Sequence, residues 1–189
     1  MIIVLDTSIS VGWSDFAHIR SFLSTLTDHV VDNLNVDSGR IPVGLLTYSS
    51  TVRPLFNLSL HTTIAPIQAA ISSFSYSRGA TNTAAALAYV RTTMLTSLAG
   101  ARDDVPSVVI VLTDGKSSDP RATRVYTGCV IHVSIHIISA GASLNEAPQL
   151  QQLALNFLAT FFTRYLNNNR HTISVVFYSC SFHLHESFT

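Results

Sequence analysis

Three short polar segments of the sequence carry side chains that could bind a hard metal cation. Asp6–Ser10, Gly79–Thr83 and Thr113–Gly115 together offer two carboxylates and several hydroxyl groups. In the pattern Asp-x-Ser-x-Ser, alternate side chains point to the same side, so the first segment can converge its oxygen atoms on one point. Oxygen donors suit Mg²⁺, Mn²⁺ or Ca²⁺, whereas zinc would prefer Cys or His. The residue types therefore indicate a site for a hard divalent cation.

Apolar patterning predicts the elements that must position these segments. Short apolar runs bounded by polar residues indicate strands, and apolar residues spaced by three and four indicate helices. The predicted strands are Ile2–Leu5, Ile41–Thr47, Thr51–Phe56, Val108–Leu112 and Val133–Ile138. The predicted helices cover Phe16–Leu34, Ile64–Phe74, the stretch marked by Leu87, Val90, Met94 and Leu98, Pro120–Val130 and Ala147–Leu155.

This alternation of strands and helices predicts an α/β fold. A doubly wound, mostly parallel sheet with helices on both faces results, and the tight turn at residues 48–50 adds one antiparallel edge strand. Ligands of such sheets bind beyond the carboxyl ends of the strands, where the three polar segments fall. We expect residues 1–166 to form one domain and residues 167–189 to be a tail of uncertain structure, in which Ile173–Phe182 is β-prone.

The composition excludes several classes of protein. The chain has 189 residues, of which 47% are hydrophobic and 12% charged, with zero formal net charge. A disordered polyampholyte would need more charge and less apolar content. Nucleic-acid binders normally show a basic excess, so no nucleic-acid partner is expected. No apolar run reaches the roughly 18 residues of a membrane-spanning helix, so no membrane span is expected either.

The polar segments, in this order, resemble those of the von Willebrand factor type A (vWA) or integrin I-like domains. The resemblance covers residues 2 to about 158 and rests on Asp6-x-Ser8-x-Ser10, Gly79–Thr83, Leu112–Gly115 and the closing Ser139–Gly141. Each piece alone is an ordinary turn sequence. The three segments that carry the candidate ligands, in the right order and each at the edge of a predicted strand or helix, are strongly specific to the family.

The resemblance implies a metal-ion-dependent adhesion site (MIDAS). Ser8, Ser10 and Thr81 would be hydroxyl ligands, and Asp6 and Asp114 would hold the ion directly or through ordered water. The implied ion is Mg²⁺, with Mn²⁺ or Ca²⁺ as alternatives. Such an ion keeps an open position that accepts an oxygen from a partner. The implied function is therefore binding of a protein, such as collagen or another matrix protein, through an acidic side chain.

An enzymatic function is not expected. A strand-terminal Asp is also the nucleophile of haloacid-dehalogenase-like phosphatases, but these need a second Asp two positions later, where this chain has Ser8. The nucleophile elbow, the P-loop and the dinucleotide fingerprint are all missing from the sequence. Binding without bond breakage is the remaining prediction.

The location of the protein has two alternative interpretations. Met1 is followed at once by an apolar run without a basic region, so we do not expect this segment to be a signal peptide. Either the protein is cytosolic or this chain begins inside a longer one. Low charge, abundant Ser and Thr, and the collagen- and matrilin-like segment Val108–Ser118 favour an extracellular, secreted adhesion module. The alternative is an intracellular vWA domain that helps to assemble a larger complex.

Two further features remain open at this point. Cys129 and Cys180 could form one disulfide or stay as buried thiols. Asn57-Leu58-Ser59 is an N-glycosylation sequon, which matters only in a secreted protein.

Overall fold

A six-stranded sheet forms the centre of the described part of the protein. The computed structural model describes residues 1–13, 16–17, 19–21, 23–24, 27, 41–102, 105, 107–113, 117–128, 133–139 and 175–179. Within these residues the strand order is β3-β2-β1-β4-β5-β6. The strands are β1 (Ile2–Asp6), β2 (Gly44–Tyr48), β3 (Val52–Phe56), β4 (Ser107–Thr113), β5 (Val133–Ser139) and β6 (Val175–Ser179).

The sheet is parallel except at one edge, where β3 pairs antiparallel with β2. This confirms the predicted doubly wound α/β architecture with an antiparallel edge strand. β6 lies within the segment for which we predicted a β-prone tail, and it pairs parallel with β5 from Ile135↔Val175 onward. The sheet therefore takes its sixth strand from the C-terminal segment.

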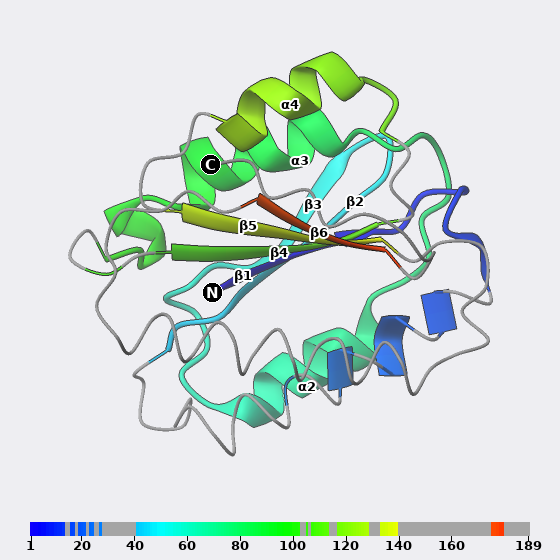
Figure 1. The fold of residues 1–189 in the computed structure, drawn as a ribbon. Helices are drawn as coiled ribbons and strands as arrows, with labels where there is room; N and C mark the ends of the chain where they lie inside the picture. Colours follow the sequence, from blue (N-terminus) through cyan, green and yellow to red (C-terminus); the bar gives the residue numbers. More distant parts are fainter. Residues whose placement is uncertain are drawn as a thin grey trace.

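Helices cover both faces of this sheet. They are α2 (Ile64–Ser73), α3 (Thr83–Tyr89) and α4 (Pro120–Gly128). Figure 1 shows α3 and α4 over one face, and α2 with the helical residues between 12 and 27 over the other. Pro66 is the third residue of α2, where its missing N–H costs no helical hydrogen bond. The helix predicted at Ala147–Leu155 lies outside the described residues.

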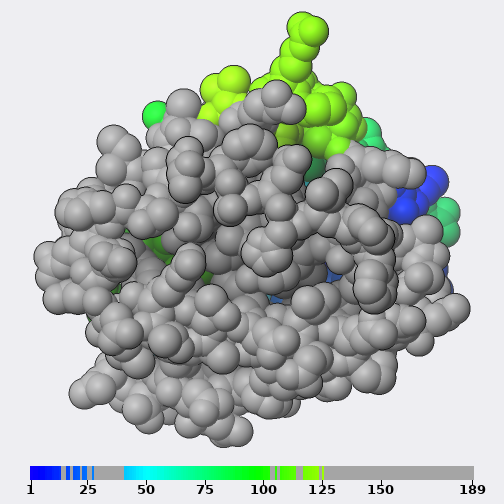
Figure 2. All heavy atoms as spheres, in the orientation of Figure 1, coloured from blue at the N-terminus to red at the C-terminus, as the bar shows by residue number. Residues whose placement is uncertain are grey.

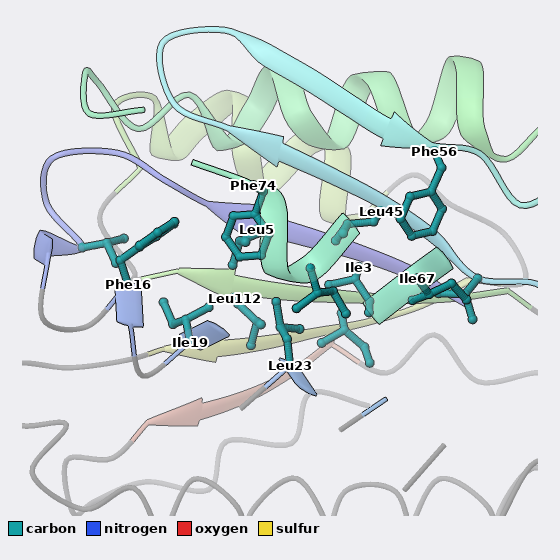
Figure 3. Close-up of a cluster of buried hydrophobic side chains, with 14 of the residues drawn as sticks. Ile3, Leu5, Phe16, Ile19, Leu23, Leu45, Phe56, Ile67, Phe74 and Leu112 are labelled. Atoms are coloured by element: carbon teal, nitrogen blue, oxygen red, sulfur yellow. The ribbon is translucent and has the colours of Figure 1, made fainter. Parts of the chain in front are cut away.

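The core has two layers because side chains of a strand alternate between its faces. Ile3 and Leu5 of β1 join the cluster packed under α2, which Figure 3 shows in close-up. Ile2 and Val4 join the cluster packed under α3. Burying each of these side chains fully contributes about 1.5–3 kcal/mol to the free energy of unfolding. Both faces of β1 are thus packed in apolar layers up to Leu5, and the strand ends at the next residue, Asp6.

The prediction for the third helix was wrong in its last turn. Leu98 was expected on the same buried face as Leu87, but its side chain is 96% exposed. The α-helix ends at Tyr89, a π-helical turn follows at Val90–Met94, and a separate 3₁₀ turn follows at Ser97–Ala99. Thr96 caps that second turn by accepting a hydrogen bond from the backbone of Ala99. The apolar residues from Leu87 to Leu98 therefore do not belong to one continuous helix, so their spacing does not place Leu98 on the buried face.

Candidate metal site

The loop that follows β1 begins with a fully buried carboxylate. Asp6 is the last residue of β1 and has no exposed surface. Its Oδ1 accepts the backbone N–H of Ser8 at 2.9 Å, and its Oδ2 accepts the Thr113 hydroxyl at 2.7 Å. The Tyr48 hydroxyl donates to the same Oδ2 at 3.4 Å. Asp6 thus fixes the first turn of the loop and links three neighbouring strands.

Three hydroxyl groups of the predicted site form a closed triangle. The oxygen of Ser8 lies 2.9 Å from that of Ser10 and 2.8 Å from that of Thr81, which donates to it. The third side, from Ser10 to Thr81, is 3.0 Å. Ser8 and Thr81 are buried, whereas Ser10 is exposed. The triangle therefore has one side open to solvent.

Backbone hydrogen bonds hold the Thr81 segment against the Ser8 segment. The N–H of Ile9 donates to the carbonyl of Gly79 at 3.1 Å. On the other side, Thr81 exchanges two hydrogen bonds with Ser118: its N–H donates to the Ser118 hydroxyl at 3.1 Å, and its carbonyl accepts the Ser118 N–H at 2.8 Å. Asn82 caps α3 by accepting the N–H of Ala85. The loop around Thr81 is therefore fixed from both sides before any ligand arrives.

A left-handed turn brings the Thr81 segment to this position. Arg78 has φ of 58° and Gly79 has φ of +88°. The left-handed conformation suits glycine and is unfavourable for arginine. A Cβ added at Gly79 would lie 2.6 Å from the Ser50 hydroxyl oxygen, which accepts the N–H of Ala80 at 2.9 Å. Gly79 is thus required here by both its backbone angle and the close approach of Ser50.

The spacing of the three hydroxyl oxygens fits a small octahedral cation. Magnesium binds oxygen at 2.0–2.1 Å, so adjacent ligands of an ideal octahedron are separated by about 2.8–3.0 Å. The sides of the triangle are 2.8, 2.9 and 3.0 Å. Calcium–oxygen distances of 2.3–2.6 Å would need octahedral separations of about 3.3–3.7 Å. The same separations are those of the hydrogen bonds between these hydroxyls, so the triangle is compatible with a small octahedral cation and does not by itself select the ion.

Charge and burial around the triangle favour a cation. The Asp6 carboxylate is buried beside Ser8 and supplies negative charge next to the three hydroxyls. Among the described residues, no group of three His, Cys, Asp or Glu side chains gathers here or at any other place. Burial, and then the negative charge of Asp6, raise the pKa of Tyr48 above the ordinary tyrosine value. Tyr48 thus stays protonated and donates a hydrogen bond to the carboxylate.

Four of the five predicted ligands meet at this site. Asp6 is bonded to the Ser8 backbone, and the hydroxyls of Ser8, Ser10 and Thr81 contact each other. The fifth, Asp114, lies outside the residues that the structure describes.

Two residues that hold Asp6 are not among the predicted site residues. They are Thr113 and Tyr48, whose hydroxyls both donate to its carboxylate. The parallel pairing of β1 with β2 places Tyr48 opposite Asp6. The sequence shows a polar residue at the end of each of these buried strands, but only the strand order reveals that both residues lie beside Asp6.

Exposed apolar side chains lie beside the triangle. Ile9, between the two serines, is 66% exposed, and Trp13 is 71% exposed. The Trp13 ring packs against the rings of Phe16 and Tyr76, each with a centroid separation of 6.0 Å. The Tyr76 hydroxyl donates to the Ile9 carbonyl. Figure 2 shows the segment after β1 and the segment between α2 and α3 side by side at one edge of the visible surface. We call Ile9, Trp13 and Tyr76 the apolar collar.

Comparison with known proteins identifies relatives of this chain among proteins of the extracellular matrix. The mouse collagen alpha-4(VI) chain is 30% identical over 156 residues, which cover 82% of this chain and 6% of that protein. Human matrilin-1 is 38% identical over 119 residues, which cover 63% of this chain and 23% of that protein. The chain therefore spans less than a quarter of the length of these two relatives.

A solved structure shares the same fold. Proximal thread matrix protein 1 from the mussel byssus, with a zinc-occupied MIDAS motif, superposes with a TM-score of 0.70. It is 21% identical and covers 83% of this chain and 47% of that chain. None of the described helices here is long and apolar enough to span a membrane. The von Willebrand factor type A domain model matches residues 1–175, and the chain is a member of that family.

Proposed function

We propose that the chain is a metal-ion-dependent protein-binding module of the extracellular matrix. The hydroxyl triangle carries this proposal: Ser8, Ser10 and Thr81 would hold Mg²⁺, and Asp6 and Asp114 would supply negative charge directly or through water. When bound, the ion supplies an open coordination position for a carboxylate oxygen of a partner protein. Similarity to a collagen VI chain and to matrilin-1 supports the matrix location.

The hydrogen bonds of Asp6 suggest how the chain prepares this site. Both carboxylate oxygens of Asp6 accept hydrogen bonds from the protein, so its orientation is fixed by Ser8 and Thr113. A buried, oriented carboxylate beside three hydroxyls attracts a cation without surrounding it. The ion would therefore keep the positive charge with which it attracts an acidic partner. The proposed activity is recognition, with no bond broken.

The apolar collar indicates a second property of the partner segment, in addition to its acidic residue. A carboxylate that reaches the triangle brings its neighbouring residues close to Ile9, whose side chain is exposed between the two serines. Trp13 is already packed against two rings, so it would lose little conformational entropy on binding. The partner segment would thus combine an acidic residue with an apolar neighbour.

Metal-dependent thermal unfolding tests the site. At a metal concentration one hundred times the dissociation constant, binding adds about 2.7 kcal/mol to the free energy of unfolding. For a domain of this size, that gain corresponds to a rise of roughly 5–10 °C in Tm. Ser8→Ala and Thr81→Val should abolish the rise with Mg²⁺, whereas Ser72→Ala, which removes an exposed hydroxyl on α2, should keep it. An unmutated protein whose Tm is the same in Mg²⁺ and in EDTA would rule out the metal site.

Binding to immobilised fibrillar collagen and collagen VI, with Mg²⁺ or with EDTA, tests the partner class. We expect binding only with Mg²⁺. Trp13→Ala should weaken it by about tenfold or more, because exposed tryptophans at interfaces are often dominant contacts. The same variant should keep the Mg²⁺-induced rise in Tm, since Trp13 is not part of the triangle. Equal binding with Mg²⁺ and with EDTA would contradict the proposed mode of recognition.

A further inference from the structure

The sequon Asn57-Leu58-Ser59 lies in a turn directly after the edge strand β3. The N–H of Leu60 donates to the Asn57 carbonyl at 3.2 Å, which closes the turn. Leu58 is buried in the cluster under α3, while Asn57 is half-buried and Ser59 is exposed. In the described part of the chain, no hydrogen bond engages the side-chain amide of Asn57. The buried leucine thus anchors a turn that leaves both reactive side chains of the sequon accessible.

Three exposed leucines belong to the turn or to segments next to it. Leu60 is 61% exposed and Leu98 is 96% exposed. The turn that carries Leu98 contacts the sequon through the Ser59 N–H, which donates to the Ala99 carbonyl at 3.1 Å. Leu55, on β3 itself, is 38% exposed. Monomeric proteins rarely leave several large apolar side chains uncovered in one place.

The edge strand next to the sequon could pair with a strand of another chain unless something covers it. Among the described strands, β3 is the last in the sheet and pairs only with β2. An edge strand presents unpaired backbone groups that can pair with another chain. Pro54 has no backbone N–H, so it removes one donor from this strand, and no described strand pairs with the outer side of β3. A bulky hydrophilic group beside β3 would block such pairing.

Asn57 is at the opposite end of the sheet from the hydroxyl triangle. Because β3 runs antiparallel to β2, its last residue Phe56 pairs with Leu45, near the start of β2, and its first residue Val52 pairs with Tyr48. Tyr48 in turn is opposite Asp6 at the end of β1. A group attached after Phe56 therefore leaves the metal site and the apolar collar open.

We propose that Asn57 carries an N-linked glycan that covers the edge strand and the exposed leucines. The donor would be a lipid-linked oligosaccharide diphosphate of the secretory pathway. A bond forms between the Asn57 amide nitrogen and the anomeric carbon of the first sugar, the bond from that carbon to the phosphate breaks, and the nitrogen loses one proton while the lipid diphosphate leaves. The proposal rests on the extracellular location given above but not on metal binding.

Expression of the whole chain behind a signal peptide in cultured animal cells tests the modification. We expect one glycan by intact mass, removed by peptide N-glycosidase F. Asn57→Gln and Ser59→Ala should each abolish it, whereas Ser59→Thr should keep it because threonine also completes the sequon. Since the glycan is attached during synthesis, loss of stability in a variant would not prevent attachment. Unmodified protein from cells that glycosylate a reporter sequon would overturn the proposal.

Size-exclusion chromatography with light scattering tests the covering role. The glycosylated protein should be monomeric, whereas enzymatically deglycosylated protein and Asn57→Gln should form larger species. Adding Leu60→Ser and Leu98→Ser to Asn57→Gln should restore the monomer, because these changes remove the two most exposed leucines next to the sequon. A deglycosylated protein that stays monomeric at the same concentration would overturn this role. The Mg²⁺-induced rise in Tm should be the same with and without the glycan, so the two proposals fail separately.

Discussion

Replacing Thr113 by valine would measure how strongly the protein holds Asp6. The substitution keeps the shape of the side chain and removes a hydroxyl that donates to the fully buried Asp6 carboxylate at 2.7 Å. Hydrogen bonds to charged groups contribute about 1.5–3 kcal/mol, and a buried carboxylate that loses a donor is further penalised. We therefore expect Thr113→Val to lower the free energy of unfolding by about 2–3 kcal/mol in EDTA, measured by urea denaturation.

Thr7→Val is the matched control for this experiment. The Thr7 hydroxyl donates to the Tyr48 carbonyl at 3.0 Å, but that neutral acceptor also receives the Thr7 N–H at 2.8 Å. Its removal should cost only about 0.5–1.5 kcal/mol. Thr113→Val should also reduce the Mg²⁺-induced rise in Tm, because Asp6 loses its fixed orientation, while Thr7→Val should keep that rise. If the two variants were equally stable and responded equally to Mg²⁺, the Thr113–Asp6 bond would not be what orients the site.

Four further substitutions probe the backbone and the titration of the site. Arg78→Gly should raise the free energy of unfolding by about 0.5–1 kcal/mol in urea denaturation, because glycine adopts the left-handed φ of 58° without strain. Gly79→Ala should lower it by about 2 kcal/mol, and Ser50→Gly should recover part of that loss, because the added Cβ would lie 2.6 Å from the Ser50 hydroxyl; additive losses in the double variant would contradict this contact. The raised pKa of Tyr48 means that its hydroxyl stays protonated in the folded state, whereas in the unfolded chain it ionises near the ordinary tyrosine pKa of 10.0. Stability should therefore fall as the pH rises above about 10, by up to 1.4 kcal/mol per pH unit, and Tyr48→Phe should flatten that fall in urea denaturation between pH 9 and 11 in EDTA.

Local patterns were sufficient to predict strands β1 to β5 and the first segment of the candidate site, whereas β6 lies in the segment predicted to be a tail of uncertain structure. β1 and β4 are continuous apolar runs because both faces are buried, so their ends were visible in the sequence. Asp6, Ser8 and Ser10 form their contacts within five residues, so the motif itself carries their geometry. Thr81 comes from a distant segment, and the resemblance to the family supplied that assignment.

Contacts that depend on sheet order were not visible in the sequence. Thr113 and Tyr48 reach Asp6 only because β1 lies between β2 and β4, and no local pattern states which strands are neighbours. The exposure of Leu98 was missed for another reason. A π-helical turn ends the helix after Tyr89 and changes the direction of the following side chains, whereas a periodic pattern assumes an unbroken helix.

The hydroxyl triangle joins residues that are far apart along the chain, and this has a consequence for folding. Ser10 and Thr81 are separated by 71 residues, and Asp6 and Thr113 by 107. These contacts exist only after the strands have assembled, so the unfolded chain should have no comparable affinity for the cation. Contacts of such long range tend to form late in folding. A metal ion bound as proposed should therefore lower the unfolding rate and leave the folding rate nearly unchanged. The metal-bound protein should thus stay folded for longer before it unfolds.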